Sequence, residues 1–179
     1  MKIVILDRDG VINEDSANYI KNPNEWIPIP QSLEAIALLK QNNFYVIIAT
    51  NQSGVGRGLY NVEVLNQIHN KMNKMLQDVG GSIDAIFFCP HTDEDNCNCR
   101  KPKIGMLEEI EKRFSSSLKK IPAIGDSARD LKAFKGIGAQ PMLVKTGNGE
   151  KTILEKKYPK NTLIFENLFH AAEFIVANY

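Results

Sequence analysis

Residues 3–10 read IVILDRDG, and this stretch decides the fold. The four apolar residues run without a polar interruption into two carboxylates, Asp7 and Asp9. A continuous apolar run of this length is typical of a strand in a parallel sheet whose two faces are both covered by helices. We therefore expect a buried strand that ends at acidic side chains.

Similar apolar runs recur along the chain and alternate with segments of helical spacing. The expected strands are residues 3–6, 45–49, 85–88, 121–124, 140–144 and 163–165. The expected helices cover residues 33–39, 64–76, 106–114, 128–134, 150–157 and 168–176, and Asn167 is the expected N-cap of the last one. This alternation predicts an α/β fold with a Rossmann-like, doubly wound parallel sheet, and residues 1–179 as a single domain.

Composition and charge narrow the functional classes. The chain has 179 residues, 43% of them hydrophobic, and 22 Lys and Arg against 21 Asp and Glu leave a net charge of +1. A balance so close to neutral gives no overall field that attracts nucleic acid or an anionic membrane. The apolar runs are shorter than the ~20 residues of a membrane-spanning helix and do not form a signal peptide. We expect a cytoplasmic monomer without nucleic-acid or membrane partners.

Unusual polar side chains come after four of the expected strands. They are Asp7 and Asp9 after the first strand, Thr50, Asn51 and Gln52 after the second, Arg100 and Lys101 a loop after the third, and Asp126 at the end of the fourth. Ligands of open α/β sheets bind beyond the carboxyl ends of the strands, so these segments are expected to converge on one site. Helix caps or turn formers are the alternative reading of a single acid pair, but four such strand ends favour a site.

The acidic residues in this set suit phosphate chemistry. Asp7 and Asp9 are two residues apart at a strand end and therefore face the same way, while Arg8 points elsewhere. With Asp7, Asp126 offers oxygen ligands of the kind that Mg²⁺ prefers. Lys101 and a bound cation would offset the repulsion between a carboxylate and an anionic phosphate. Thr50 and Asn51 supply short donors for phosphoryl oxygens.

All three cysteines fall in one window. Cys89, His91, Cys97 and Cys99 form a Cys₃His set, a combination that binds structural Zn²⁺ in closed tetrahedral sites. Buried cysteines beside a surface histidine are the alternative. Residues 93–95, Asp-Glu-Asp, are expected to form the solvated tip of this loop.

A few other residues stand out without forming a motif. Residues 53–58 are glycine-rich but lack the ending of a P-loop, so they predict a turn or a ligand contact through Arg57. His69 and His170 lie on expected helices, where a surface or core role is favoured over catalysis. Trp26 is expected to serve packing.

Taken together, the motifs resemble a known family. Residues 7–13, 50–54, 100–102 and 125–130 resemble, in order and spacing, the four signature motifs of the haloacid dehalogenase superfamily of phosphatases. The Cys/His window is similar to the zinc loop of its capless, histidinol-phosphatase-like branch. The resemblance implies the fold of that superfamily, Mg²⁺ as catalytic cofactor and Zn²⁺ as a structural ion.

The resemblance also implies a role for each motif residue. Asp7 would be the nucleophile that forms an aspartyl-phosphate, and Asp9 the general acid and base. Mg²⁺ would be held by Asp7, the Asp9 backbone and Asp126. Thr50 and Lys101 would orient the phosphoryl group, with Asp130 as support behind them. The implied substrate contacts are Asp15, Ser16, Ala17, Asn18, Asn51, Gln52, Ser53 and Arg100.

The implied substrate is a small phosphorylated sugar, heptose 1,7-bisphosphate, which would lose its C7 phosphate in the supply of ADP- or GDP-heptose for lipopolysaccharide. Histidinol phosphate is the alternative substrate. A polynucleotide 3′-phosphatase would be expected to have a basic groove, and a phospho-accepting signalling domain would lack a base such as Asp9. Ile104 stands where this branch commonly has a second proline, and the loop from His91 to Cys97 is short.

Overall fold

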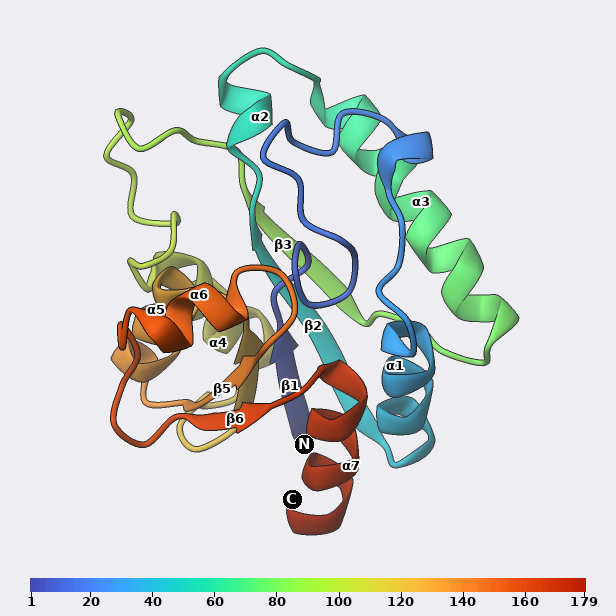
Figure 1. Ribbon diagram of the computed structural model, residues 1–179, viewed down its shortest axis with the longest axis vertical. Helices are drawn as coiled ribbons and strands as arrows, with labels where there is room; N and C mark the ends of the chain where they lie inside the picture. Colours follow the sequence, from blue (N-terminus) through green and yellow to red (C-terminus); the bar gives the residue numbers. More distant parts are fainter.

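Six parallel strands form one sheet at the centre of the computed structural model, which describes residues 1–179 (Figure 1). The strands are β1 (Lys2–Leu6), β2 (Phe44–Asn51), β3 (Ala85–Cys89), β4 (Pro122–Gly125), β5 (Gln140–Val144) and β6 (Leu163–Phe165). Their order in the sheet is β3-β2-β1-β4-β5-β6, so the chain winds outward from β1 to one side and then from β4 to the other. The predicted doubly wound α/β fold is confirmed.

Helices follow the strands at the predicted places. They are η1 (Pro23–Glu25), α1 (Ser32–Gln41), α2 (Ser53–Gly56), α3 (Val62–Asp78), α4 (Gly105–Phe114), α5 (Ala128–Ile137), α6 (Gly149–Leu154) and α7 (Leu168–Asn178). Asn167 caps α7 as expected, because its side chain accepts a hydrogen bond from the backbone N–H of His170. The predicted helix over 150–157 ends earlier, before Lys156, whose backbone takes a left-handed conformation. The short helices η1 and α2 were not predicted.

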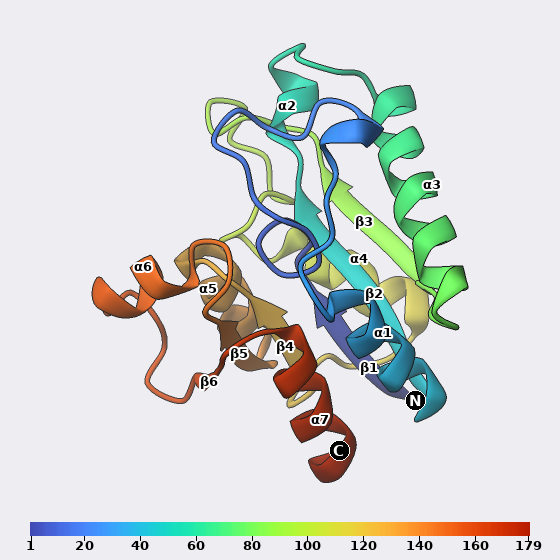
Figure 2. The ribbon, with the colours of Figure 1, turned by 45° about the vertical axis from the view of Figure 1, so that its right-hand side comes forward.

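The alternation of side chains along β1 divides the core in two. Val4 and Leu6 point into a core that also contains buried residues of α1, α3 and α7. Ile3 and Ile5 point to the other face, where they pack with buried residues of α4 and α5. Figure 2 shows α1, α3 and α7 on one side of the sheet and α4 and α5 on the other. Both faces of β1 are therefore covered, as its uninterrupted apolar run requires.

The site lies where the winding direction changes. β1 pairs with both β2 and β4, so the loops after these three strands leave the sheet side by side. The loop between β1 and α1 and the loop between β3 and α4 extend above this edge (Figure 1). A crevice at such a switch point is the usual place for a ligand. Among the helices, none combines the length and the apolar character that crossing a membrane requires.

Candidate active site and metal centres

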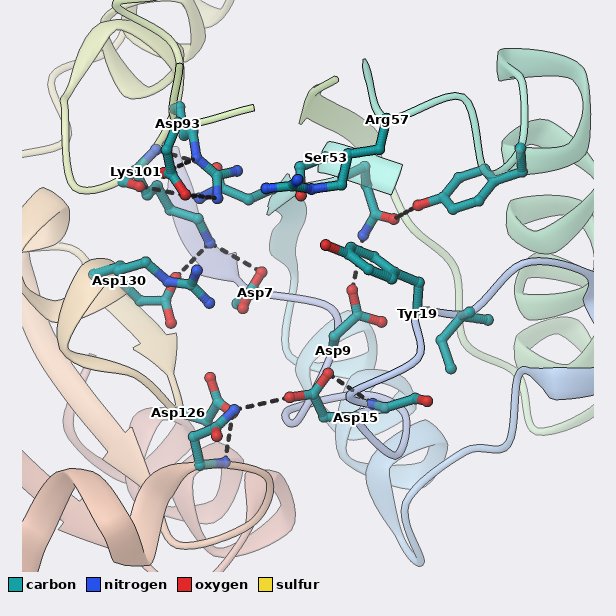
Figure 3. A pocket seen from close by; sticks show the side chains of 18 residues that line it. Asp7, Asp9, Asp15, Tyr19, Ser53, Arg57, Asp93, Lys101, Asp126 and Asp130 are labelled. Atoms are coloured by element: carbon teal, nitrogen blue, oxygen red, sulfur yellow. Dashed lines mark hydrogen bonds and ion pairs between the residues drawn. The ribbon is translucent and has the colours of Figure 1, made fainter. Parts of the chain in front are cut away.

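A polar cavity of about 290 Å³ opens at this edge of the sheet (Figure 3). Of the 18 residues that line it, only three are hydrophobic. The lining includes eleven of the residues predicted from the sequence: Asp7, Asp9, Asp15, Ser16, Asn51, Gln52, Ser53, Arg100, Lys101, Asp126 and Asp130. The expected convergence of strand ends on one place is therefore present.

Lys101 ties together two of the acidic residues. Its Nζ lies 2.9 Å from Asp7 Oδ1 and 2.6 Å from Asp130 Oδ1, and it donates to the backbone oxygen of Ala49 at 2.7 Å. The ammonium group has three N–H donors, and these three acceptors match them. Burial opposes the charged form of Lys101, but Asp130 and Asp7 outweigh it and raise the pKa of the amine. Lys101 is therefore a fixed positive charge beside Asp7.

The end of β2 holds the Lys101 segment in place. Asn51 donates from Nδ2 to the backbone oxygen of Lys101 at 3.0 Å and accepts from its backbone N–H at 3.1 Å. Thr50 is 1% exposed, and its hydroxyl oxygen accepts from Gln52 Nε2 at 3.0 Å. Thr50 thus lies directly behind the cavity lining, while Asn51 faces it.

Asp130 supports the site from the first turn of α5. Its carboxylate accepts hydrogen bonds from the backbone N–H and the hydroxyl of Ser127, which makes a capping box. Burial raises the pKa of Asp130, but Lys101 and Ser127 outweigh burial and lower it. Its supporting role in the reaction stays a prediction.

Asp126 lies in a space that only glycine backbones leave open. Its Oδ2 accepts from the backbone N–H of Asn148 at 2.7 Å. A Cβ atom on Gly10 would lie 2.1 Å from Asp126 Oδ2, and one on Gly147 would lie 2.3 Å from it. Both glycines also have positive φ angles, +80° and +58°. Two loops therefore approach Asp126 as closely as glycine allows.

Three buried acids surround one lysine in a group here called the carboxylate cluster: Asp7, Asp126, Asp130 and Lys101. The three carboxylates carry more negative charge than Lys101 can balance. One carboxylate oxygen from each acid lies within 4.8 Å of those of the other two. Burial, with Asp130 next in importance, raises the pKa of Asp7 to about 7. Burial, followed by Asp130 and Asp7, also raises the pKa of Asp126 well above its usual value. Asp7 Oδ1 is buried and has no partner besides the ammonium group of Lys101. A hard divalent cation such as Mg²⁺ fits this oxygen set and would relieve the repulsion.

The side chain of Asp9 lies apart from the carboxylate cluster. It lines the same cavity, but it accepts hydrogen bonds from Arg8, Asn13 and Gln52. Burial raises the pKa of Asp9, yet Arg8, Asn13 and Gln52 outweigh burial and lower it. Arg8 leaves the cavity as the strand alternation predicts, but it turns back to Asp9 and is completely buried. The burial of Arg8 could not be predicted because its other partners, Gln52 and His69, come from distant segments.

The predicted substrate loop after β1 is only partly at the cavity. Asp15 and Ser16 line it, and Asp15 Oδ2 accepts from Asn148 Nδ2 at 2.8 Å. Ala17 and Asn18 are exposed on the same loop and do not belong to the cavity lining. Their assignment as substrate contacts stays a prediction.

Cys89, His91, Cys97 and Cys99, here called the Cys/His cluster, meet at one point. Neighbouring ligand atoms lie 3.3–3.6 Å apart, such as Cys99 Sγ and Cys89 Sγ at 3.3 Å and Cys89 Sγ and His91 Nδ1 at 3.6 Å. Zn–S bonds of 2.3 Å in a tetrahedron place sulfur atoms about 3.8 Å apart, so the four atoms fit one Zn²⁺ with slight expansion. All three cysteines are free thiols. The arrangement is compatible with the predicted zinc site.

Residues 93–95 at the tip of this loop are exposed, as expected, and Asp93 also makes an ion pair that was not predicted. Asp93 is exposed, but its Oδ1 accepts from Arg100 Nε at 2.6 Å, and Asp93 lines the cavity. Arg100 lowers the pKa of Asp93, with smaller contributions from Arg129 and Arg57. The pair forms because the loop folds back over Arg100, which also donates to the backbone oxygen of His91.

Several lining residues were missed by the sequence analysis. The cavity is also lined by Tyr19, Tyr60, Arg129 and Asn148. Arg57 lines it too, although the sequence favoured a turn and a ligand contact equally there. Arg129 lies within the fourth motif, residues 125–130, and could have been found from its position. Tyr19 and Tyr60 carry no signal, because they reach the cavity only through the path of their loops.

The comparisons with known proteins agree with this geometry. The model of the polynucleotide kinase 3 phosphatase family matches residues 2–161. The chain belongs to this family of phosphatases. A Had-superfamily hydrolase from Ehrlichia chaffeensis, 21% identical in sequence, aligns with a TM-score of 0.60 over 90% of this chain and 64% of that one. The haloacid dehalogenase fold implied by the motifs is therefore confirmed.

The chain is also similar to proteins of narrower description. D-glycero-beta-D-manno-heptose-1,7-bisphosphate 7-phosphatase from Bordetella bronchiseptica is 50% identical over 173 residues, which cover 97% of each chain. The protein of the same description from Neisseria meningitidis serogroup A is 46% identical over 98% of this chain and 95% of that one. The crystal structure of D,D-heptose 1,7-bisphosphate phosphatase from B. bronchiseptica, complexed with magnesium and phosphate, aligns over the full length of both chains with a TM-score of 0.98 and 49% identity. The similarity to these relatives and to this crystal structure confirms that the chain is a phosphatase.

Proposed function

We propose that this phosphatase removes the C7 phosphate of D-glycero-D-manno-heptose 1,7-bisphosphate with the help of Mg²⁺, in the supply of nucleotide-activated heptose. The observation that carries the proposal is the polar cavity at the switch point, where Asp7 faces Lys101 and Asp9 lines the same wall. Relatives described as 7-phosphatases of this sugar match nearly the whole chain at 46–50% identity, which supports the choice of substrate.

Asp7 is the proposed nucleophile. Its carboxylate lies at the end of β1 against the fixed charge of Lys101, which draws the anionic phosphoryl group toward it. An oxygen of Asp7 attacks the phosphorus, the bond to the sugar oxygen breaks, and an aspartyl-phosphate results. Thr50 and Asn51 hold the strand end and the Lys101 segment in the positions that this attack needs.

Asp9 is the proposed acid and base. It gives a proton to the departing sugar oxygen and then takes one from the water that releases inorganic phosphate from Asp7. Asp7, Asp126 and the backbone carbonyl of Asp9 are the proposed ligands of Mg²⁺. When bound, the ion supplies positive charge that lets the carboxylate and the phosphate approach. Asp130 keeps Lys101 directed at the same place.

Specificity is proposed to come from the loops around the cavity. Arg100 is the proposed contact to the part of the substrate beyond the reacting phosphate, joined by residues 15–18 and 51–53. Zn²⁺ at the Cys/His cluster is proposed to be structural, because four protein ligands leave no open coordination position. It would fix the loop that carries Arg100.

A panel of substrates tests the assignment. We expect kcat/KM for heptose 1,7-bisphosphate to exceed the values for histidinol phosphate, fructose 1,6-bisphosphate and a 3′-phosphorylated oligonucleotide by at least ~10²-fold, as expected of a site whose polar groups match one substrate. Phosphorus NMR should show loss of the C7 phosphate and retention of the C1 phosphate. Both anomers belong in the panel. A higher value for histidinol phosphate or for the oligonucleotide contradicts the proposed substrate and leaves the phosphatase chemistry intact.

A further inference from the structure

A completely buried arginine contacts the proposed acid and base. The Arg8 side chain is only 1% exposed, and its guanidinium approaches Asp9 with two nitrogens. Nε donates to Asp9 Oδ1 at 3.1 Å, and Nη2 donates to Oδ1 at 2.9 Å and to Oδ2 at 3.1 Å. A planar fork of this kind fixes the carboxylate plane as well as its distance, which a lysine cannot do.

Gln52 holds the same arrangement from the end of β2. Its Oε1 accepts from Arg8 Nη2 at 3.1 Å and from the Tyr60 hydroxyl at 2.8 Å. Its Nε2 donates to Asp9 Oδ2 at 2.8 Å and to Thr50 Oγ1 at 3.0 Å. All the hydrogen-bonding positions of the amide are therefore used, and turning it over would place donors against donors.

The two oxygens of Asp9 are engaged unequally. Oδ1 accepts from Arg8 Nε, Arg8 Nη2 and Asn13 Nδ2, the last at 2.9 Å. Oδ2 accepts from Gln52 at 2.8 Å and from Arg8 only at 3.1 Å. Oδ1 therefore faces three donors and Oδ2 only two, so Oδ2 is the less engaged oxygen and the one more available to a further partner. The Asp9 side chain is 22% exposed, in contrast to 1% for Arg8.

His69 closes the network from α3. Its Nε2 lies 3.3 Å from Arg8 Nη1, and the ring is buried. Burial, followed by the charge of Arg8, lowers the pKa of His69 to about 4. The ring is therefore neutral at pH 7, and its Nε2 accepts a hydrogen bond from Arg8 Nη1. A charged ring at this place would repel the guanidinium.

We propose that Arg8 is a positioning residue for proton transfer, and that with Gln52 and His69 it holds Asp9 so that Oδ2 exchanges the proton. This inference rests on the proposed function, in which Asp9 is the acid and base. In the first half-reaction Asp7 bonds to phosphorus, the bond to the sugar oxygen breaks, and the proton of Asp9 Oδ2 moves to that oxygen. In the second, Oδ2 takes a proton from water, the water oxygen bonds to phosphorus, and the bond to Asp7 breaks.

The test compares substrates with poor and good leaving groups. In Arg8→Lys we expect kcat for the sugar bisphosphate to fall by about 10²-fold with KM within about threefold, because acid–base catalysis is typically of this size. p-Nitrophenolate leaves without a proton, so p-nitrophenyl phosphate should still phosphorylate Asp7. Stopped-flow absorbance should then show a burst near one equivalent of p-nitrophenolate, followed by slow turnover, because hydrolysis of the aspartyl-phosphate still needs the base.

Asp9→Asn is the reference and should give the same burst. A burst in Asp9→Asn without one in Arg8→Lys overturns the inference and leaves the proposed function standing. Wild-type turnover in Asp9→Asn overturns the role of Asp9 and the inference with it. A raised KM with unchanged kcat in Arg8→Lys also overturns the inference. Lys40→Met, which removes the ion pair of Lys40 with Asp84 away from the site, is the control with unchanged kinetics.

A second pair of variants serves if Arg8→Lys does not fold. His69→Gln keeps an acceptor for Arg8 Nη1, whereas His69→Leu removes it at similar volume. We expect His69→Leu to lower kcat for the sugar bisphosphate several-fold, with the burst described above, and His69→Gln to restore most of the rate. Equal rates in the two variants, at matched thermal stability, overturn the inference.

Discussion

The carboxylate cluster and the Cys/His cluster both gather ligands for a metal ion, but the fold holds them in different ways. The acids of the carboxylate cluster are buried at the ends of strands or in the first turn of α5, and the sheet fixes their backbones. In the Cys/His cluster only Cys89 lies on a strand, and residues 90–103 contain no Val, Leu, Ile, Met, Phe, Tyr or Trp. The fold thus positions the first cluster, whereas an ion in the second would position the loop.

The largest effect is expected at the carboxylate cluster. Asp7→Asn should lower phosphate release by at least about 10³-fold, as is usual when a nucleophile is removed. The fold should persist, because Lys101 keeps Asp130 and Ala49 as partners. A colorimetric phosphate assay and circular dichroism measure the two properties. Glu14→Gln, an exposed neighbour outside the cavity, is the control, and turnover near wild type in Asp7→Asn removes this residue as the nucleophile.

Metal removal separates the two clusters directly. Stripping Zn²⁺, or the variant Cys97→Ala, should lower Tm by several degrees and expose residues 90–99 to protease, because these residues have few other fixed contacts, whereas Lys101 stays held by Asp7, Asp130 and Ala49. Removing Mg²⁺ should stop turnover and lower Tm less than the loss of Zn²⁺ does, because the sheet still fixes the backbones of the acids. Metal analysis of protein purified without chelator should find about one Zn²⁺ per chain. Asn98→Ala, between two ligands, is the control, and protein without zinc contradicts the structural site.

A moderate effect is expected from His69 on acid stability. Its pKa of about 4 lies below the unfolded value, so the unfolded chain binds more protons between pH 6.5 and 4. The free energy of unfolding therefore falls as the pH drops from 6.5 toward 4, because protons favour the unfolded chain. The loss from His69 is at most about 3 kcal/mol, and above pH 6.5 there is no such loss. Urea unfolding should therefore show that the free energy of unfolding falls less in His69→Gln than in the wild type between pH 6.5 and 4. If the free energy of unfolding falls equally with pH in the wild type and in His69→Gln, His69 is not held neutral by burial.

The smallest effect is expected at the tip of the Cys/His loop. Asp93 pairs with Arg100, but 76% of its side-chain surface is exposed. Exposed pairs contribute below about 1 kcal/mol, so Asp93→Asn should lower the free energy of unfolding only slightly. The difference should shrink further in high salt. A loss as large as that of Cys97→Ala would show that this ion pair, and not the metal, holds the loop.

The sequence predicted the sheet well because its strands are continuous apolar runs, and it predicted the meeting of Asp7, Lys101 and Asp126 because parallel strands end at one edge. It did not predict the contacts of Arg8 with Gln52 and His69, since these residues approach only after β2 and α3 are packed. The pairing of Asp93 was missed for the same reason. The sequence pattern within one strand or helix indicates which side chains are buried and which way they point. Contacts between loops that are distant in sequence depend on the assembled fold.

The close approach of Gly10 and Gly147 to Asp126 also limits how this chain can vary. Even alanine at either position would place a methyl carbon within 2.3 Å of a carboxylate oxygen. A saturation library selected for activity should therefore return glycine at both sites, although neither residue has a side chain that could take part in the reaction. Engineering for a new substrate would then have to change the outer loops and leave these two positions alone.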